Sequence, residues 1–510
     1  MSLAIVFTRA NIGVDAPLVT VETHLSNGLP SFTIVGLPET AVRESRERVR
    51  CAILNAHLDF PTRRITINLA PADLPKSGGR FDLAIAVSIL AASGQLPVQA
   101  LEGVELLGEL ALTGALRSVY GVLPALIGAR GMGRSLLIPM ANREEAELLP
   151  DAKAYAGEHL LDVCKQLQTG SGMTLCCAKT VRGEGAVKTG EFDLVRGQTA
   201  AKRALAVAAA GSHNILFVGP PGTGKTMLAR SLECLLPSLH ETAALEAAAI
   251  RSISKQTLDP KNWLQAPFRM PHHTATNIAL VGGGSNAFPG EVSLAHQGVL
   301  FLDELTEFKR SVLESLREPL ESGVITISRA SYRLELPAKF QLIAAMNPCP
   351  CGFYGDPQGR CQCTPERVQR YLDKVSGPLL DRIDLIIEVP RISFEDLRPA
   401  TQVQETRVSE EAVLRSKIVD CRDLQYQRAA KLNKELNNNE LERFCQLDSD
   451  CEQLLTQAIS KLSLSARASH RILKIARTIA DLEMRANITA ADLAEAISYR
   501  RYLQVLNPHA

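Results

Sequence analysis

The segment between residues 214 and 237 constrains the fold of this chain more than any other feature. The short apolar run Asn214–Val218 is typical of a buried strand, and residues 219–226 follow it directly. These eight residues match the pattern GxxxxGK[ST], and apolar positions with helical spacing continue to Leu235, before Pro237. A strand, a glycine loop and a helix in this order predict a nucleoside triphosphate site in an α/β domain.

Each residue type in this loop has a chemical reason to be there. Glycines allow backbone N–H groups to turn toward the phosphates at the positive end of the following helix. Lys225 supplies a positive charge to the β- and γ-phosphate oxygens, and the Thr226 hydroxyl is the expected magnesium ligand. The predicted phosphate-binding residues are Gly219, Pro220, Pro221, Gly222, Thr223, Gly224, Lys225 and Thr226.

Two carboxylates follow a second apolar strand, at residues 298–302. They are Asp303 and Glu304, and acids at the C-terminal end of a central parallel strand lie beside the phosphate loop. We expect Asp303 to hold magnesium and Glu304 to polarise the attacking water. The pattern therefore predicts hydrolysis in addition to binding.

Two further polar residues stand at strand junctions. A third apolar strand ends at Asn347, whose amide is suited to orient water against the γ-phosphate. Arg382 precedes another apolar strand and has no obvious neutralising partner, which fits an arginine finger given to a neighbouring subunit. The alternative is a local ion pair of Arg382 with Asp381 or Asp384.

Four cysteines form two CxC pairs that are nine residues apart. Residues i and i+2 of an extended backbone point to the same side, so each pair can offer two thiolates to one ion. Four sulfurs from one short loop suit tetrahedral zinc, with reduced structural cysteines and a redox switch as the alternatives. The candidate zinc ligands are Cys349, Cys351, Cys361 and Cys363.

The segment Val324–Leu336 alternates apolar and polar residues around a turn, which predicts a β-hairpin. Its tip carries Arg329, Tyr332 and Arg333, a mixture of cations and an aromatic ring that is suited to phosphates and stacked bases. A solvated tip without a ligand is the alternative.

The chain divides into three domains by its pattern of elements. Residues 1–168 and 191–395 alternate strands and helices, a glycine-rich linker at 169–190 joins them, and residues 396–510 are helical. The net charge of +1 excludes a polycationic coat but leaves room for a local basic channel. No apolar run reaches the roughly 18 residues of a membrane span, and neither a signal peptide nor a disulfide framework is evident, so we expect a cytoplasmic protein.

These motifs together resemble an AAA+ ATPase. Residues 268–274 and 275–296 are similar to the magnesium-chelatase branch of that superfamily, and residues 463–471 resemble its helical lid. The lid of that branch has an arginine that reads the γ-phosphate, and the resemblance assigns this role to Arg467, with Arg471 second. The implied fold is an AAA+ P-loop NTPase core of the α/β class with a helical C-terminal lid.

Nearly the whole chain resembles the ComM (YifB-like) family of bacterial competence proteins. The resemblance implies a homohexameric ring that uses ATP and Mg²⁺, binds single-stranded, duplex or branched DNA, and drives branch migration during natural transformation. A different class of function is a metal-insertion chaperone like the magnesium-chelatase ATPase subunit, which remodels a protein partner.

The N-terminal domain resembles the proteolytic domain of Lon, an S5 domain 2-like α/β fold. Residues 108–114 are similar to the strand that precedes Lon's catalytic lysine. Residues 76–80 are similar to the loop that carries its serine. Aligned in this way, Arg80 takes the place of the serine and Leu123 that of the lysine. Ser77 is another conceivable nucleophile, but no lysine lies between Lys76 and Lys153 to activate it, so we expect no protease activity.

Overall fold

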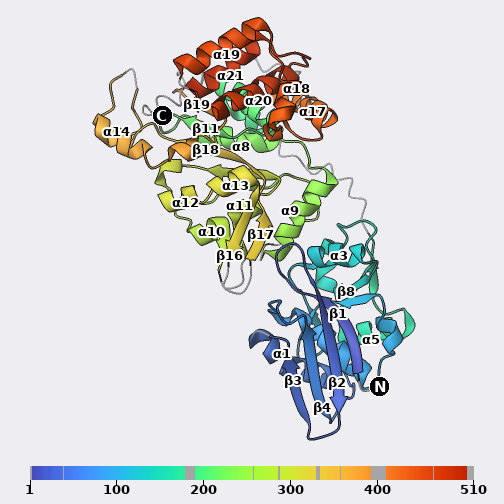
Figure 1. The fold of residues 1–510 in the computed structure, drawn as a ribbon. Helices are drawn as coiled ribbons and strands as arrows, with labels where there is room; N and C mark the ends of the chain where they lie inside the picture. Colours follow the sequence, from blue (N-terminus) through green and yellow to red (C-terminus); the bar gives the residue numbers. More distant parts are fainter. Residues whose placement is uncertain are drawn as a thin grey trace.

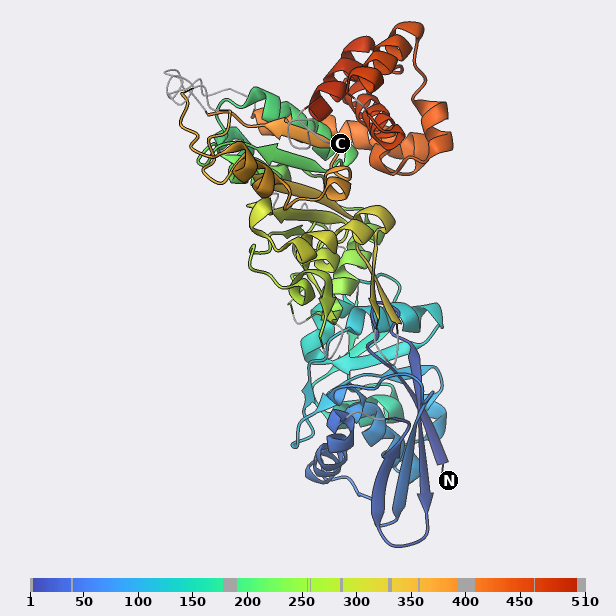
Figure 2. The same ribbon diagram turned by 60° about the vertical axis from the view of Figure 1, so that its left-hand side comes forward.

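The computed structural model describes residues 3–37, 40–177, 190–254, 256, 258–284, 288–328, 333–355, 358–391, 409–462 and 464–501. Figure 1 shows the N-terminal domain at the lower end, a central domain above it, and helices α17 to α21 at the upper end. The same three-part arrangement is seen from the second direction in Figure 2.

The N-terminal domain is built on an eight-stranded mixed sheet with the order β10-β9-β8-β5-β1-β2-β4-β3. Alternate residues of β2 are buried, and all eleven residues of the mainly apolar helix α2 are buried, including Asp82 and Ser88. The strands are β1 (Leu3–Arg9), β2 (Leu18–Ser26), β3 (Ser31–Val35), β4 (Arg64–Ala70), β5 (Val104–Leu106), β8 (Ser135–Pro139), β9 (Ala154–Gly157) and β10 (Thr174–Cys176). The helices are α1 (Thr40–Asn55), α2 (Asp82–Ala92), α3 (Val122–Gly131), α4 (Arg143–Ala146) and α5 (Leu160–Thr169).

The central domain contains a five-stranded parallel sheet with the order β12-β15-β18-β11-β19. Its central strands are buried along their whole length, in agreement with their continuous apolar sequences. The strands are β11 (Ile215–Val218), β12 (Phe268–Arg269), β15 (Gly298–Leu302), β18 (Phe340–Met346) and β19 (Leu385–Glu388). The longer helices are α7 (Thr199–Gly211), α8 (Lys225–Leu235), α9 (Glu241–Ile253) and α14 (Pro365–Leu372).

The predicted hairpin is confirmed. Strands β16 (Val324–Ser328) and β17 (Arg333–Pro337) pair antiparallel, with Ser328 opposite Arg333. A smaller two-stranded ribbon pairs β13 (Gly282–Gly283) with β14 (Phe288–Pro289). The hairpin extends from the central domain toward the N-terminal domain (Figure 1).

The C-terminal domain is helical, as the sequence predicts. It consists of α17 (Glu410–Ala429), α18 (Asn438–Phe444), α19 (Ser449–Lys461), α20 (Ala466–Leu482) and α21 (Ala490–Arg501). Its apolar residues join a single core with α7 and the central sheet, in which Ile472 and Ile475 pack with Ala204 and Ile215. The helical domain is therefore packed onto the central domain through a shared core.

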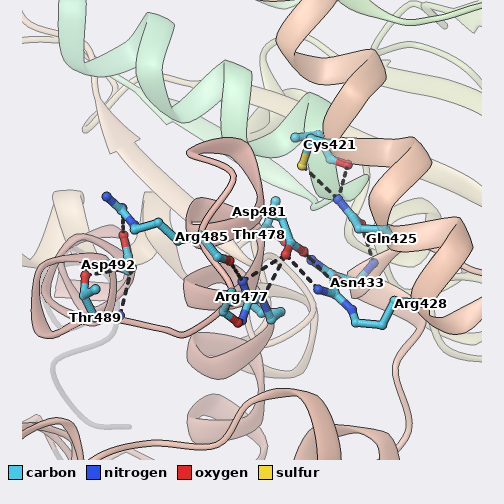
Figure 3. Close-up of polar contacts among 12 residues, drawn as sticks. Cys421, Gln425, Arg428, Asn433, Arg477, Thr478, Asp481, Arg485, Thr489 and Asp492 are labelled. Carbon is cyan, nitrogen blue, oxygen red and sulfur yellow. Dashed lines mark hydrogen bonds and ion pairs between the residues drawn. The ribbon is translucent and has the colours of Figure 1, made fainter.

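A buried polar network holds the helical domain together (Figure 3). The fully buried Asp481 accepts hydrogen bonds from Arg428 at 2.6 and 2.7 Å, from Arg477 at 3.0 Å and from Asn433 at 2.8 Å. Two positive groups around one carboxylate satisfy the charge that burial would otherwise penalise.

Helix α9 joins the central domain to the N-terminal domain. The Ser252 hydroxyl of this helix donates to the buried carboxylate of Glu145. The backbone carbonyl of Ser252 accepts a hydrogen bond from the Gly121 N–H at 2.8 Å. Ala248 of the same helix packs into the core around α3. The contact combines apolar packing with buried hydrogen bonds.

The structure describes only some of the predicted domain boundaries. The linker does not begin at residue 169, because Thr174–Cys176 forms β10 at the edge of the N-terminal sheet. The three residues add a last antiparallel strand beside β9, so the N-terminal domain extends past residue 168. Residues 178–189 and the boundary at 395/396 lie outside the described residues. Among the described helices, none is both long and apolar enough to cross a membrane.

We predict that Asp481→Ala destabilises the chain by about 3 kcal/mol or more, because Arg428 and Arg477 would keep their buried charges without the carboxylate between them. Urea unfolding followed by circular dichroism measures this change. The matched control is Glu410→Ala, which removes the more exposed partner of Lys202 and should cost less than about 1 kcal/mol. Equal effects of the two substitutions would contradict the role of the network.

Candidate nucleotide-binding site

The phosphate loop connects β11 to α8 at the C-terminal edge of the parallel sheet. Gly222 and Gly224 adopt positive φ values of 77° and 85°, which residues with side chains rarely adopt. A Cβ atom at Gly219 would collide with the Val389 carbonyl oxygen of the adjacent strand end. The glycines of the motif therefore serve both the turn and the close approach of the backbone.

Lys225 is held over this loop by three hydrogen bonds. Its Nζ donates to the carbonyl oxygens of Gly219 and Pro220, both at 2.7 Å, and to Oδ1 of Asn347 at 3.1 Å. Burial lowers the pKa of Lys225 to about 8, against the opposing effect of Asp303 and Glu304. The structure thus brings together the loop lysine and the strand-end amide that the sequence predicts at one site.

Thr226 and Asp303 form the expected magnesium pair. The Thr226 hydroxyl donates to Oδ2 of Asp303 at 2.7 Å. A hydroxyl in the first turn of α8 and a carboxylate at the end of β15 are oxygen ligands that suit Mg²⁺, which keeps several of its waters and takes few protein ligands. The residues present therefore fit the ion.

Glu304 has a partner that sequence reasoning missed. His273 Nδ1 lies 3.2 Å from Glu304 Oε2, and both side chains are partly exposed. From the sequence we expect only a hydrogen-bonding or DNA-facing role for the pair of histidines at 272 and 273. The sequence does not reveal this contact because it depends on the order of the strands in the sheet. His273 follows β12, which lies directly beside β15.

Arg382 lies at the opposite edge of the sheet. It precedes β19, which runs parallel to β11, so it is at the start of a strand whose end faces the phosphate loop. Arg382 has two partners in the structure, because Nη2 donates to Glu321 and Nη1 donates to the Pro378 carbonyl at 2.7 Å. Glu321 is far away in the sequence, so no local pattern indicates this pair.

The arginines of the helical domain gather at this same edge. Arg471 donates to the Asp381 carbonyl and lies 3.6 Å from Asp384. A hydrogen bond from Arg382 lowers the pKa of Glu321, and the charges of Arg467 and Arg471 lower it further. Arg467, the predicted γ-phosphate sensor, is exposed at the start of α20 and belongs to the Arg382 edge.

The four cysteines of the CxC pairs converge as the spacing predicts. Their Sγ atoms all lie within 4.8 Å of one another, and the closest two, those of Cys349 and Cys351, are 3.2 Å apart. These distances are too long for disulfides and suit four thiolates around one ion. Burial opposes ionisation of Cys351, but hydrogen bonds from the Phe353 backbone and from Cys349 lower its pKa to about 6.

The cysteine loop packs against the phosphate loop. Gly352, with a φ of 82°, is so close to Pro221 that a Cβ atom there would lie 2.5 Å from the proline Cδ. Cys349 is fully buried and follows Asn347 by two residues. A change in the cysteine loop therefore reaches two parts of the nucleotide site.

The predicted DNA-contacting residues are only partly described. Arg329 and Tyr332 lie outside the described residues. Arg333 stands at the start of β17 with a side chain that is 68% exposed, and it pairs with Glu335 at 3.1 Å. Its position leaves it accessible to a ligand.

The residues at the protease-like positions have structural partners. Arg80 is buried and donates to the Tyr120 carbonyl at 3.2 Å, while the Leu123 N–H donates to Glu145 at 2.9 Å. Lys76, next to Ser77, donates its amine to the carbonyl oxygens of residues 36, 71 and 74. A lysine bound in this way is not a free base for Ser77.

Comparison with known proteins gives matches across the whole chain. Residues 191–397 match the family described as magnesium chelatase, subunit ChlI, residues 21–142 match subunit ChlI of Mg-chelatase, and residues 407–500 match the C-terminal part of that subunit. The magnesium-chelatase 67 kDa subunit of Heliobacterium mobile is 27% identical, over 44% of this chain and 38% of that protein.

Two relatives match over nearly their full length. The competence protein ComM of Haemophilus influenzae is 51% identical over 99% of both chains. The uncharacterized protein YifB of Salmonella typhimurium is 48% identical over 98% of this chain and 97% of the relative. The chain therefore belongs to the ComM/YifB family and contains an AAA+ core of the magnesium-chelatase type.

Proposed function

We propose that the chain is an ATP-driven DNA motor that works as a hexameric ring and moves DNA branches while transforming DNA is integrated by homologous recombination. The observation that carries the proposal is the full-length identity to a competence protein, together with a complete set of hydrolytic residues around the phosphate loop. Neither feature alone identifies DNA as the substrate.

The hydrolytic chemistry is divided among the side chains of this edge. Lys225 and the loop N–H groups bind the phosphates, and Asn347 orients the water against the γ-phosphate. Glu304 accepts a hydrogen bond from that water and polarises it once His273 releases the carboxylate. Bound Mg²⁺, held by Thr226 and Asp303, supplies positive charge to the phosphate oxygens.

The position of the arginines supports a ring. The loop and Arg382 lie at opposite ends of the parallel strands β11 and β19, separated by roughly 10 Å at about 3.3 Å per residue. Arg382, Arg467 and Arg471 therefore serve a nucleotide held by an adjacent subunit. A closed ring of identical subunits joins one edge to the other at every interface.

DNA binding is assigned to the β16–β17 hairpin. Arg333 on β17 contributes an exposed charge, and Arg329 and Tyr332 follow as candidates from the sequence. Cations beside an aromatic ring bind phosphates and stack on bases without strong sequence preference, which suits a motor.

The cysteine cluster is assigned to one structural zinc ion. Cys349, Cys351, Cys361 and Cys363 would hold it as thiolates in a closed tetrahedral site. The ion would fix the loop that carries Gly352 against the phosphate loop.

The central test measures ATP hydrolysis and the dissociation of a three-stranded branched DNA. We expect the wild type to do both, Lys225→Ala to bind no ATP, and Glu304→Gln to bind ATP but turn over roughly 100-fold more slowly, because general-base polarisation is lost. Neither variant should dissociate the branch.

Salt-sensitive DNA binding by both variants is the control for folding and for the DNA contacts. ATP hydrolysis without any binding or dissociation of DNA would favour a chaperone like the magnesium-chelatase subunit. Wild-type turnover by Glu304→Gln would overturn the assignment of that residue.

A mixing experiment tests the shared site. Arg382→Ala should bind ATP normally but hydrolyse it roughly 1,000-fold more slowly, as expected for the loss of an arginine finger. Mixed rings of Arg382→Ala and Lys225→Ala should regain activity, since some interfaces then combine an intact loop with an intact arginine. Absence of recovery in confirmed mixed rings would show that Arg382 acts within its own chain.

Removal of the metal tests the cysteine site. Protein purified without chelator should contain about one zinc per chain, and Cys351→Ser should release it. Because Gly352 packs on Pro221, hydrolysis and assembly should decrease together in this variant. Cys421→Ser, at a buried cysteine of the helical domain, is the control and should keep the metal. A metal-free protein with full ATPase activity would contradict the assignment.

A further inference from the structure

Arg500, near the end of α21, is a buried arginine whose guanidinium has no hydrogen-bond partner among the described residues. The residue is 2% exposed, and none of its three guanidinium nitrogens has a partner among the described residues. Burial lowers its pKa to about 10. A buried donor without an acceptor is costly, so an arginine in this state calls for an explanation.

Two other arginines of the same domain have acceptors, although Nε of Arg428 has none among the described residues. Arg477 is equally buried, yet it donates to Asp481 and to the carbonyl oxygens of Arg485 and Ala486 (Figure 3). Arg428 binds the same carboxylate with two of its nitrogens. The helical domain therefore supplies acceptors for its structural arginines, and Arg500 is an exception.

Arg500 lies near the edge of the sheet at which Arg382 and Arg471 gather, which we call the arginine edge. The charges that act on it are those of Arg471, Asp384 and Asp381. The Asp384 side chain is already engaged, because it accepts the Asn214 N–H at 2.9 Å, whereas at Asp381 the backbone carbonyl accepts from Arg471.

The cluster has an excess of positive charge. Four arginines, at 382, 467, 471 and 500, face three acids, at 321, 381 and 384. A cavity of about 630 Å³ lies nearby between the central and helical domains and is bordered by Glu321, Lys434 and Lys474, but none of the four arginines lines it. An anion with several acceptor oxygens, such as a phosphate group, matches this excess and the unused donors.

We propose that Arg500 binds the γ-phosphate of a nucleotide held by the phosphate loop of an adjacent copy of this chain, as a third arginine beside Arg382 and Arg471. The inference rests on the proposed ring. In the free chain the guanidinium is 2% exposed and has no partner among the described residues, so assembly has both to expose it and to supply the phosphate oxygens that it lacks.

The first test separates binding from structure. In the free chain, Arg500→Met should leave the melting temperature unchanged or higher, because no hydrogen bond is lost and a buried charge is removed. Arg428→Met, the matched control in the same domain, should lower it, because Asp481 loses a partner. A comparable decrease for Arg500→Met would overturn the proposal by showing that the guanidinium is structural.

The second test uses activity in mixed rings. Arg500→Met should bind ATP normally but hydrolyse it about 10- to 100-fold more slowly, the loss expected for hydrogen bonds to a charged group. Mixing it with Lys225→Ala should restore activity, because an intact loop then meets an intact arginine edge. Mixing it with Arg382→Ala should not, because every interface then lacks one arginine. Full activity of Arg500→Met, or recovery with Arg382→Ala, would overturn the proposal.

A third measurement identifies the source of the phosphate. Inorganic phosphate should not raise the melting temperature of the free wild-type chain, because the site forms with a neighbour's nucleotide. Stabilisation by inorganic phosphate that Arg500→Met abolishes would overturn that source and assign a free-phosphate site. Failure of the ring itself is recognised separately, by normal hydrolysis in Arg382→Ala.

Discussion

The parallel pairing of β11 with β19 is the constraint on which the rest of the structure depends. Because the two strands run in the same direction, the loop that follows Val218 and the arginine that precedes Leu385 come to opposite edges of one sheet. No side-chain rotation brings Arg382 to Lys225 of the same chain, since roughly 10 Å of strand, at about 3.3 Å per residue, lies between their edges. In the proposed ring, the phosphate loop and the arginines are parts of one hydrolytic site that two copies of the chain complete.

Asp384 connects these edges to the helical domain. It accepts the backbone N–H of Asn214 at the start of β11 and lies 3.6 Å from Arg471 of α20. Burial alone would raise its pKa, but the charge of Arg471 and of His213 keeps the pKa below its ordinary value. The central sheet and the lid therefore share one buried negative charge. In the proposed ring, a neighbour's nucleotide that draws Arg471 away would alter the surroundings of this charge and so affect the position of the helical domain.

The structural features that could be predicted from the sequence are those determined by local sequence patterns. The phosphate loop, the hairpin and the convergence of the cysteines depend on residues close together in the chain, whose spacing alone sets their geometry. The contacts of Glu304 with His273 and of Arg382 with Glu321 were not predictable, because they depend on strand order and on the packing of distant segments. The end of the N-terminal domain was misjudged for the same reason, since β10 is a strand only by virtue of its pairing with β9.

In the N-terminal domain, a position that resembles a catalytic one has a structural role. The backbone N–H of Leu123, which takes the place of Lon's lysine in the resemblance, lies 3.3 Å from the Ser252 hydroxyl of α9 and also donates to Glu145. The loop after β1 packs on the hairpin, where a Cβ atom at Gly13 would lie 2.5 Å from Leu334 Cδ1. The domain thus contacts the central domain at both α9 and the part of β17 next to the turn of the hairpin. Two contacts on different elements restrict rotation of the N-terminal domain against the central domain more than a single contact would. The N-terminal domain therefore supports the hairpin to which we assign DNA binding.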